Sequence, residues 1–164
     1  MEKMKMMDSK LRIGIDFHGV ITEAPAFFRD FTALAIERNY EVHIISGGPY
    51  SVEKNFLDSW KIQYTQIFSL LDYFAARGQV EYFANGNFKV PDVLWDKAKA
   101  EYCLQHNINI QIDDTFNYGK SFSTPFCLYN AATATCEIGG KTIDFSKSPT
   151  DALDAIEQFM NSRN

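Results

Sequence analysis

The sequence has no excess of basic residues and no long hydrophobic run. Lysine and arginine number 16 against 21 aspartate and glutamate residues, so the formal net charge is −5. A protein that tracks a nucleic-acid backbone normally has the opposite balance, and we expect no such surface. No segment approaches the ~20 apolar residues that span a bilayer, and the first ten residues, MEKMKMMDSK, are too polar for a secretory signal. We therefore expect a cytoplasmic protein without a membrane partner.

Cysteine is also scarce. Cys103, Cys127 and Cys136 are odd in number, and no two of them have CxxC or zinc-ligand spacing. Because each lies in or beside an apolar run, we expect buried free thiols rather than disulfides or a zinc site.

The remaining composition is that of a folded protein. The chain has 164 residues, of which 46% are hydrophobic and 15% aromatic, enough for a substantial core in one domain. We interpret residues 1–10 as a disordered N-terminal segment and residues 11–164 as a single α/β domain. Neither a repeat nor a linker interrupts it.

Strand-like and helix-like segments alternate along the chain. Short apolar runs predict strands at 11–17, 40–46, 62–69, 108–115 and 124–130, and helical spacing predicts helices at 25–39, 51–61, 70–78, 91–107 and 148–160. This order predicts a doubly wound, mostly parallel sheet with helices on both faces and a small C-terminal hairpin around Gly139 and Gly140. Residues 80–90 are compatible with a second hairpin that turns at Asn85 and Gly86.

Polar residues stand at the ends of three predicted strands. Asp16 and His18 follow the first strand, Ser46 ends the second, and Asp113 and Asp114 end a later one. In open α/β sheets, ligands bind at the carboxyl ends of the strands, and a buried strand that ends in carboxylates implies a site that offsets their desolvation. Clustered carboxylates repel one another, and Mg²⁺ would relieve that repulsion. The alternative is that these acids only open turns.

The order of these motifs resembles the haloacid dehalogenase superfamily. The segments that carry the resemblance are DFHGVIT, HIISGG, WDKAKAEYC and IQIDDT, which together lie within residues 11 to about 118. The resemblance implies a Rossmann-like fold and a Mg²⁺-dependent phosphoryl hydrolase that forms an aspartyl-phosphate on Asp16. The residues after Thr124 contribute no motif.

The resemblance also implies ligands for the metal and for the phosphate. Asp16, the backbone carbonyl of His18, and Asp113 or Asp114 would hold Mg²⁺, with Asp114 as the direct ligand and Asp113 behind it. Ser46 would donate a hydrogen bond to a phosphoryl oxygen, helped by the amides of Gly47 and Gly48.

The identity of the site lysine stays open between three residues. Lys99 has Trp95, Tyr102 and Cys103 as its helical neighbours, which favours it as the lysine that reaches the site. Lys97 falls on a more polar helix face, and Lys89 matches the spacing in other branches of the superfamily.

His18 is the clear departure from the family pattern. Phosphatases of this superfamily have a second aspartate at this position, which protonates the leaving oxygen and later activates water. His18 could perform the same acid–base work, serve a transfer whose leaving group needs no proton, or mark a protein that only binds phosphate or metal. A histidine that merely fills the turn is the structural alternative. We interpret His43 and His106 as surface or helix-end residues.

The spacing of the motifs leaves no room for a large cap domain. Residues 17–45 are enough for one crossover helix, and the segment 79–90 could form at most a small flap. An open site implies a bulky or macromolecule-borne phosphate, or a lid from a second subunit of a homo-oligomer. A signalling receiver domain also uses an acid pair, a Ser/Thr and a Lys, but in an order that this sequence reverses.

Overall fold

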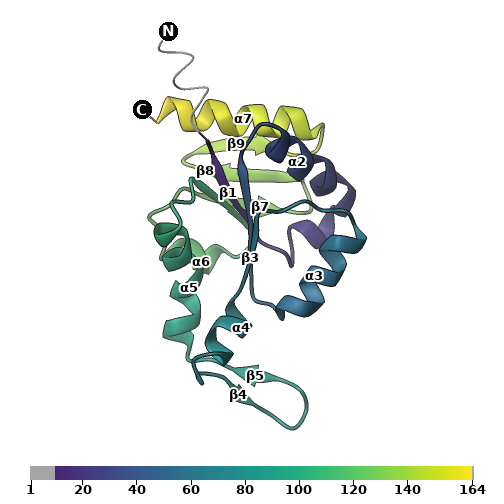
Figure 1. Ribbon diagram of the computed structural model, residues 1–164. Helices are drawn as coiled ribbons and strands as arrows, with labels where there is room; N and C mark the ends of the chain where they lie inside the picture. Colours follow the sequence, from purple (N-terminus) through teal and green to yellow (C-terminus); the bar gives the residue numbers. More distant parts are fainter. Residues whose placement is uncertain (1–9, 164) are drawn as a thin grey trace.

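A seven-stranded sheet forms the centre of the molecule. The computed structural model describes residues 10–163, in which the strands run in the order β3-β2-β1-β6-β7-β8-β9 (Figure 1). The first five strands in this order are parallel, and β8 runs antiparallel to both of its neighbours, β7 and β9. Their bounds are Arg12–Ile15 (β1), Glu41–Ser46 (β2), Gln66–Ser69 (β3), Ile110–Asp113 (β6), Phe126–Asn130 (β7), Thr135–Ile138 (β8) and Lys141–Asp144 (β9). The predicted N-terminal segment lies outside the described residues, apart from Lys10.

Helices cover both faces of this sheet, as predicted. One face packs against α2 (Pro25–Glu37), α3 (Tyr50–Ser59) and α7 (Pro149–Ser162), and the other packs against α5 (Asp92–Gln105). The shorter helical segments are η1 (Ile21–Glu23), α4 (Leu70–Ala75) and α6 (Phe116–Gly119). No described helix is long and apolar enough to cross a membrane.

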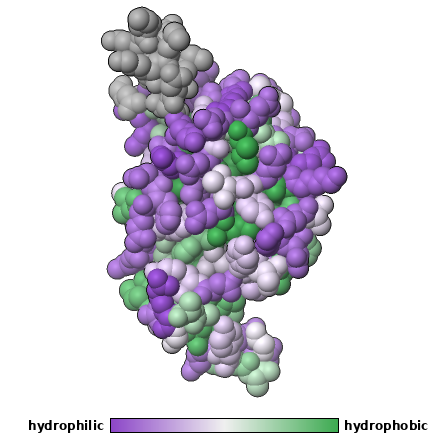
Figure 2. All heavy atoms as spheres, viewed as in Figure 1, coloured by the Kyte–Doolittle hydropathy of each residue, from purple (hydrophilic) through white to green (hydrophobic). Residues whose placement is uncertain are grey.

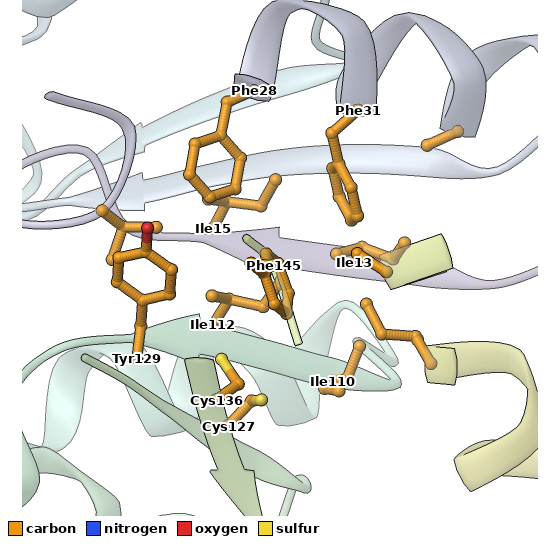
Figure 3. Close-up of a cluster of buried hydrophobic side chains, with 14 of the residues drawn as sticks. Ile13, Ile15, Phe28, Phe31, Ile110, Ile112, Cys127, Tyr129, Cys136 and Phe145 are labelled. Atoms are coloured by element: carbon orange, nitrogen blue, oxygen red, sulfur yellow. The ribbon is translucent and has the colours of Figure 1, made fainter. Parts of the chain in front are cut away.

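The face toward α2 and α7 holds the main hydrophobic core. Ile13 and Ile15 are two residues apart in β1, so both side chains point to this face of the sheet. Phe28 and Phe31 of α2 pack over them (Figure 3). Phe28 is fully buried, and its ring lies 6.0 Å from that of Tyr129 between centroids. Part of the aromatic content therefore fills the core, whereas other rings, such as that of Phe116, are exposed. All three cysteines are buried and free, as predicted.

The face toward α5 is more polar. Gly14, His43 and Gln111 lie side by side on the three neighbouring strands β1, β2 and β6. His43 is buried, and its Nδ1 lies 2.8 Å from the hydroxyl of Tyr102 on α5. The interpretation of His43 as a surface residue was therefore wrong, because its position in β2 directs it under a helix rather than to solvent.

Two hairpins differ in how they relate to this sheet. The turn at Gly139 and Gly140, both with positive φ, joins β8 to β9, and these strands extend the central sheet instead of forming a separate unit. The segment 80–90 does form a hairpin, from β4 (Glu81–Tyr82) and β5 (Phe88–Lys89), with Gly86 at φ +88° in its turn. It projects from the body as a narrow arm beyond α4, with a surface of mixed polarity (Figures 1 and 2).

The helix after β2 begins differently from the prediction. Its first residue is Tyr50 and its N-cap is Pro49, whereas the predicted helix began at residue 51. The C-terminal helix is capped by Ser148, whose hydroxyl accepts a hydrogen bond from the Asp151 amide at 3.0 Å.

We predict that Phe28→Ala lowers the free energy of unfolding by about 3–5 kcal/mol, because it removes buried apolar atoms and leaves an apolar cavity in the core. Phe116→Ala is the matched control, since that side chain is 66% exposed and its removal should change stability by about 0.5 kcal/mol or less. Urea unfolding of both variants measures the difference, and equal effects would contradict this description of the core.

Candidate active site

A buried lysine joins two strand-end carboxylates. The ammonium of Lys99 lies 3.0 Å from Asp16 Oδ1 and 2.8 Å from Asp113 Oδ2. Asp16 follows β1, Asp113 ends β6, and both point toward α5 because they alternate with the isoleucines that face the main core. Lys99 is 3% exposed, so this contact is shielded from water.

Burial and charge act on these groups in opposite directions. Burial raises the pKa of Asp16 well above its usual value, and Lys99 opposes this by favouring the carboxylate. Burial alone would lower the pKa of Lys99, but the two carboxylates more than compensate and raise it. The lysine is therefore held in its charged form.

The two adjacent acids at the end of β6 have different surroundings. Both oxygens of Asp113 accept hydrogen bonds: Oδ1 from the Thr115 amide at 3.1 Å, and Oδ2 from Lys99 and from Gln111 Nε2 at 3.2 Å. Asp114 is exposed and accepts a bond from the Thr115 hydroxyl at 3.3 Å. One carboxylate oxygen from each of Asp16, Asp113 and Asp114 lies within 4.8 Å of the others.

Gly19 lets the chain pass close to Asp114. Its φ is +84°, and a Cβ atom there would collide with the Asp114 carboxylate. Only glycine meets both conditions without strain. The glycine of the DFHGVIT segment thus determines how near the loop after β1 can come to the acids after β6.

Ser46, by contrast, is directed toward α3. Its position in β2 matches that of Val42 and Ile44, which face the main core. Its hydroxyl donates to Glu53 Oε2 at 2.7 Å, and the amide of Gly48 donates to the same oxygen at 3.0 Å. Two of the donors predicted for a phosphate therefore contact a carboxylate of the protein itself.

Glu53 is a residue that the sequence analysis missed. The predicted helix began at residue 51, but its acid was not singled out, and the Glu53 side chain is fully buried. Burial raises its pKa, although the bonds from Ser46 and Gly48 act the other way. The signal available in the sequence is an acid one helical turn into α3, next to the glycines that follow β2.

His18 lies at the mouth of the site. Its side chain is 67% exposed, and its Nε2 is 3.7 Å from Glu53 Oε2. The ring also meets Phe17 edge to face, with 4.9 Å between centroids. The imidazole is therefore accessible to a ligand on one side and close to a buried carboxylate on the other.

A hollow of about 280 Å³ lies between these groups. Its lining consists of Asp16, His18, Gly19, Ser46, Gly47, Lys99, Asp114, Thr115 and Tyr118. Tyr118, which the sequence analysis did not single out, lies with its ring centre 5.0 Å from the Lys99 nitrogen, and its hydroxyl accepts a bond from Trp95 at 2.9 Å.

The other two candidate lysines lie elsewhere. Lys89 is in β5 of the projecting arm and pairs with Asp92 at 2.7 Å. Lys97 is exposed on α5 and lines a separate hollow of about 560 Å³ between α4 and α5. Of the three, Lys99 is the one that the structure brings to Asp16.

Comparisons with known proteins do not identify a family. No family model and no curated protein shows a significant match. A solved structure of a glycosyltransferase from Rickettsia africae ESF-5 matches with 16% sequence identity and a TM-score of 0.43. The match covers 74% of this chain but 31% of the glycosyltransferase, so this chain spans less than a third of that protein.

We predict that Lys99→Met lowers the free energy of unfolding by about 3–5 kcal/mol at neutral pH, because it leaves Asp16 and Asp113 buried without their cation. The raised pKa of Asp16 means that the folded state binds this proton more readily than the unfolded state does. The loss should therefore shrink as the pH falls toward about 4, where unfolded aspartate takes up its proton.

Chemical unfolding in the presence of a chelator, repeated across this pH range, measures the effect. Lys97→Met is the matched control, because that lysine is exposed on the same helix. A loss that grows on acidification would contradict the prediction.

Proposed function

We propose that the chain is a Mg²⁺-dependent phosphoryl hydrolase of the haloacid dehalogenase type, with Asp16 as its nucleophile. The observation that carries the proposal is the cluster of three strand-end carboxylates within 4.8 Å, two of which contact the buried Lys99. The strand order supports it, since β1 with Asp16 lies between β2 with Ser46 and β6 with Asp113.

The charges of this cluster favour a divalent cation. Three carboxylates face one ammonium, which leaves two negative charges without a partner when all are ionised. Oxygen ligands from a few carboxylates, completed by water, are the set that Mg²⁺ prefers. Asp16, Asp114 and the backbone carbonyl of His18 would hold the ion, because Asp113 already uses both oxygens for hydrogen bonds. The ion would supply positive charge to the phosphoryl oxygens.

Asp16 is arranged to attack with one oxygen. The bonds from Lys99 and from the Phe17 amide both fall on Oδ1, which leaves Oδ2 for phosphorus. In the first step the bond between this oxygen and phosphorus forms, the bond from phosphorus to the leaving oxygen breaks, and the leaving oxygen takes a proton. In the second step water attacks phosphorus and releases phosphate and the free carboxylate.

Lys99 and Ser46 would hold the phosphoryl oxygens. An ammonium has three N–H donors, and the two carboxylates use two of those of Lys99. Ser46 has a single hydroxyl proton, so it must turn away from Glu53 to reach a phosphoryl oxygen. Gly47 also lines the same hollow.

The open surroundings support a large phosphorylated substrate. The hollow of about 280 Å³ adjoins another of about 410 Å³, with which it shares Gly19 and Asp114. Among the described residues, η1 and α2 are the elements between β1 and β2, which leaves no cap domain in that segment. The leaving group would extend into this second hollow.

A second candidate function is a phosphate- or metal-binding protein without turnover. The observation that favours it is the engagement of both Ser46 and Gly48 by Glu53, which places a protein carboxylate against donors that a phosphate would need. The exposed His18 in place of the usual aspartate agrees with this reading.

We predict that Mg²⁺ binds the wild-type protein and that Asp114→Ala weakens binding at least tenfold, about 1.4 kcal/mol, because it removes a direct ligand. Isothermal titration calorimetry with magnesium chloride measures both affinities. Asp96→Ala is the control, since this acid is exposed on α5 away from the cluster. Equal affinity in the wild type and Asp114→Ala would remove the metal assignment.

We predict that Asp16→Asn abolishes the hydrolysis of p-nitrophenyl phosphate in the presence of Mg²⁺, because it removes the nucleophile and one metal ligand together. A hydroxylamine-sensitive phosphoenzyme should form on the wild type and be absent from the variant. Asp96→Asn, which makes the same change at an exposed site, should retain the wild-type rate.

His18 variants distinguish the two candidate functions. His18→Ala should reduce turnover roughly 10²–10⁴-fold if the imidazole is the acid–base group. A wild type that is inert on aryl and alkyl phosphates, with activity gained by His18→Asp alone, would favour the binding protein instead.

A further inference from the structure

Glu53 is a buried carboxylate, and one of its two oxygens has no hydrogen-bond partner among the described residues. Its side chain is fully buried, and Oε2 accepts the bonds from Ser46 and Gly48. The other oxygen, Oε1, has no hydrogen-bond partner among the described residues. A buried polar atom without a hydrogen bond lowers the stability of the folded state by about 1–3 kcal/mol, and by more when it is charged. Such an atom therefore calls for an explanation, and a functional role is one of them.

The imidazole of His18 lies close to this carboxylate. Its Nε2 is 3.7 Å from Glu53 Oε2, which is within ion-pair distance but longer than a hydrogen bond. The two residues come from different elements, one from the loop after β1 and the other from the first turns of α3. The ring of His18 is 67% exposed.

We propose that Glu53 is a positioning residue that holds the imidazole of His18 over the phosphate site, through a carboxylate–imidazole pair. This inference rests on the proposed phosphoryl-transfer function. Nε2–H donates to Glu53, so Nδ1 is the nitrogen that faces the substrate.

The pair explains how a histidine can replace an aspartate in this turn. In the first step the Nδ1–H bond of the imidazolium breaks and the proton goes to the leaving oxygen. In the second step the neutral Nδ1 takes a proton from the water that attacks phosphorus. Throughout, the carboxylate of Glu53 orients the ring by accepting the Nε2–H bond, as an acid does for a catalytic histidine in other hydrolases.

A purely structural role for Glu53 is the competing explanation, since it also holds Ser46 and Gly48. Glu53→Gln separates the two roles. The amide oxygen of glutamine can accept both bonds at the position of Oε2, while its NH₂ group takes the place of the unpaired Oε1. The strand end therefore keeps its contacts, but the imidazole loses its charge partner.

The experiment is a kinetic double-mutant cycle on p-nitrophenyl phosphate with Mg²⁺. In the wild-type background, Glu53→Gln should lower kcat about tenfold or more with little change in KM. In the His18→Ala background it should lower kcat no further, because the group that it positions is gone. In the His18→Asp background it should raise kcat, since Glu53 and the new carboxylate would repel each other.

A spectroscopic measurement keeps this inference separate from the proposed function. The ¹⁵N chemical shifts of the His18 ring, recorded at one fixed pH, should change in Glu53→Gln because the acceptor that faces Nε2 loses its negative charge. Unchanged ¹⁵N shifts, or the same fold-loss of kcat with and without His18, would overturn the pairing. If the wild type has no turnover on any phosphate, the proposed function fails, and the ring shifts alone decide whether the pair exists.

Discussion

The ammonium of Lys99 between Asp16 and Asp113 is the interaction on which the site depends. It brings α5 onto the polar face of the sheet and lets two carboxylates end buried strands at 0–5% exposure. The glycine in β1, Gly14, belongs to the same arrangement, because a Cβ there would collide with the side-chain oxygen of Gln111, which in turn contacts Asp113. A buried charge is tolerable only when paired, so the lysine, the two acids and the polar residues beneath them form one unit.

Strand alternation made much of this predictable from the sequence. The isoleucines at 13, 15, 110 and 112 share one face, and so Asp16 and Asp113 had to share the other, where the predicted helix 91–107 supplies Lys99. The helical neighbours of Lys99 are apolar. This favoured Lys99 as the site lysine over Lys89 and over Lys97, which falls on a more polar helix face. The order of strands and helices followed from the same patterns, down to the hairpin at Gly139.

The same alternation shows why the role of Ser46 was harder to predict. Ser46 has the parity of Val42 and Ile44, so its side chain starts from the α3 face, whereas Asp16 and Lys99 meet on the α5 face. The motif in the sequence indicates which residues end the strands, but not the face of the sheet to which each side chain points. The partner, Glu53, comes from a helix whose start depends on a loop of two glycines and a proline, and such boundaries are weakly specified by local pattern.

The two sides of the site differ in charge, with Lys99 on the α5 side and Glu53 on the α3 side. On the α5 side, a cation offsets an excess of carboxylates. On the α3 side, the carboxylate of Glu53 accepts hydrogen bonds from neutral donors and lies 3.7 Å from an exposed imidazole. His18 lies at the boundary, in the loop that Gly19 keeps close to Asp114. An aspartate at position 18 would add a negative charge beside Glu53, which is already buried and half satisfied. A histidine at that position adds no such repulsion, so the histidine in the turn and the buried acid in α3 are compatible with each other.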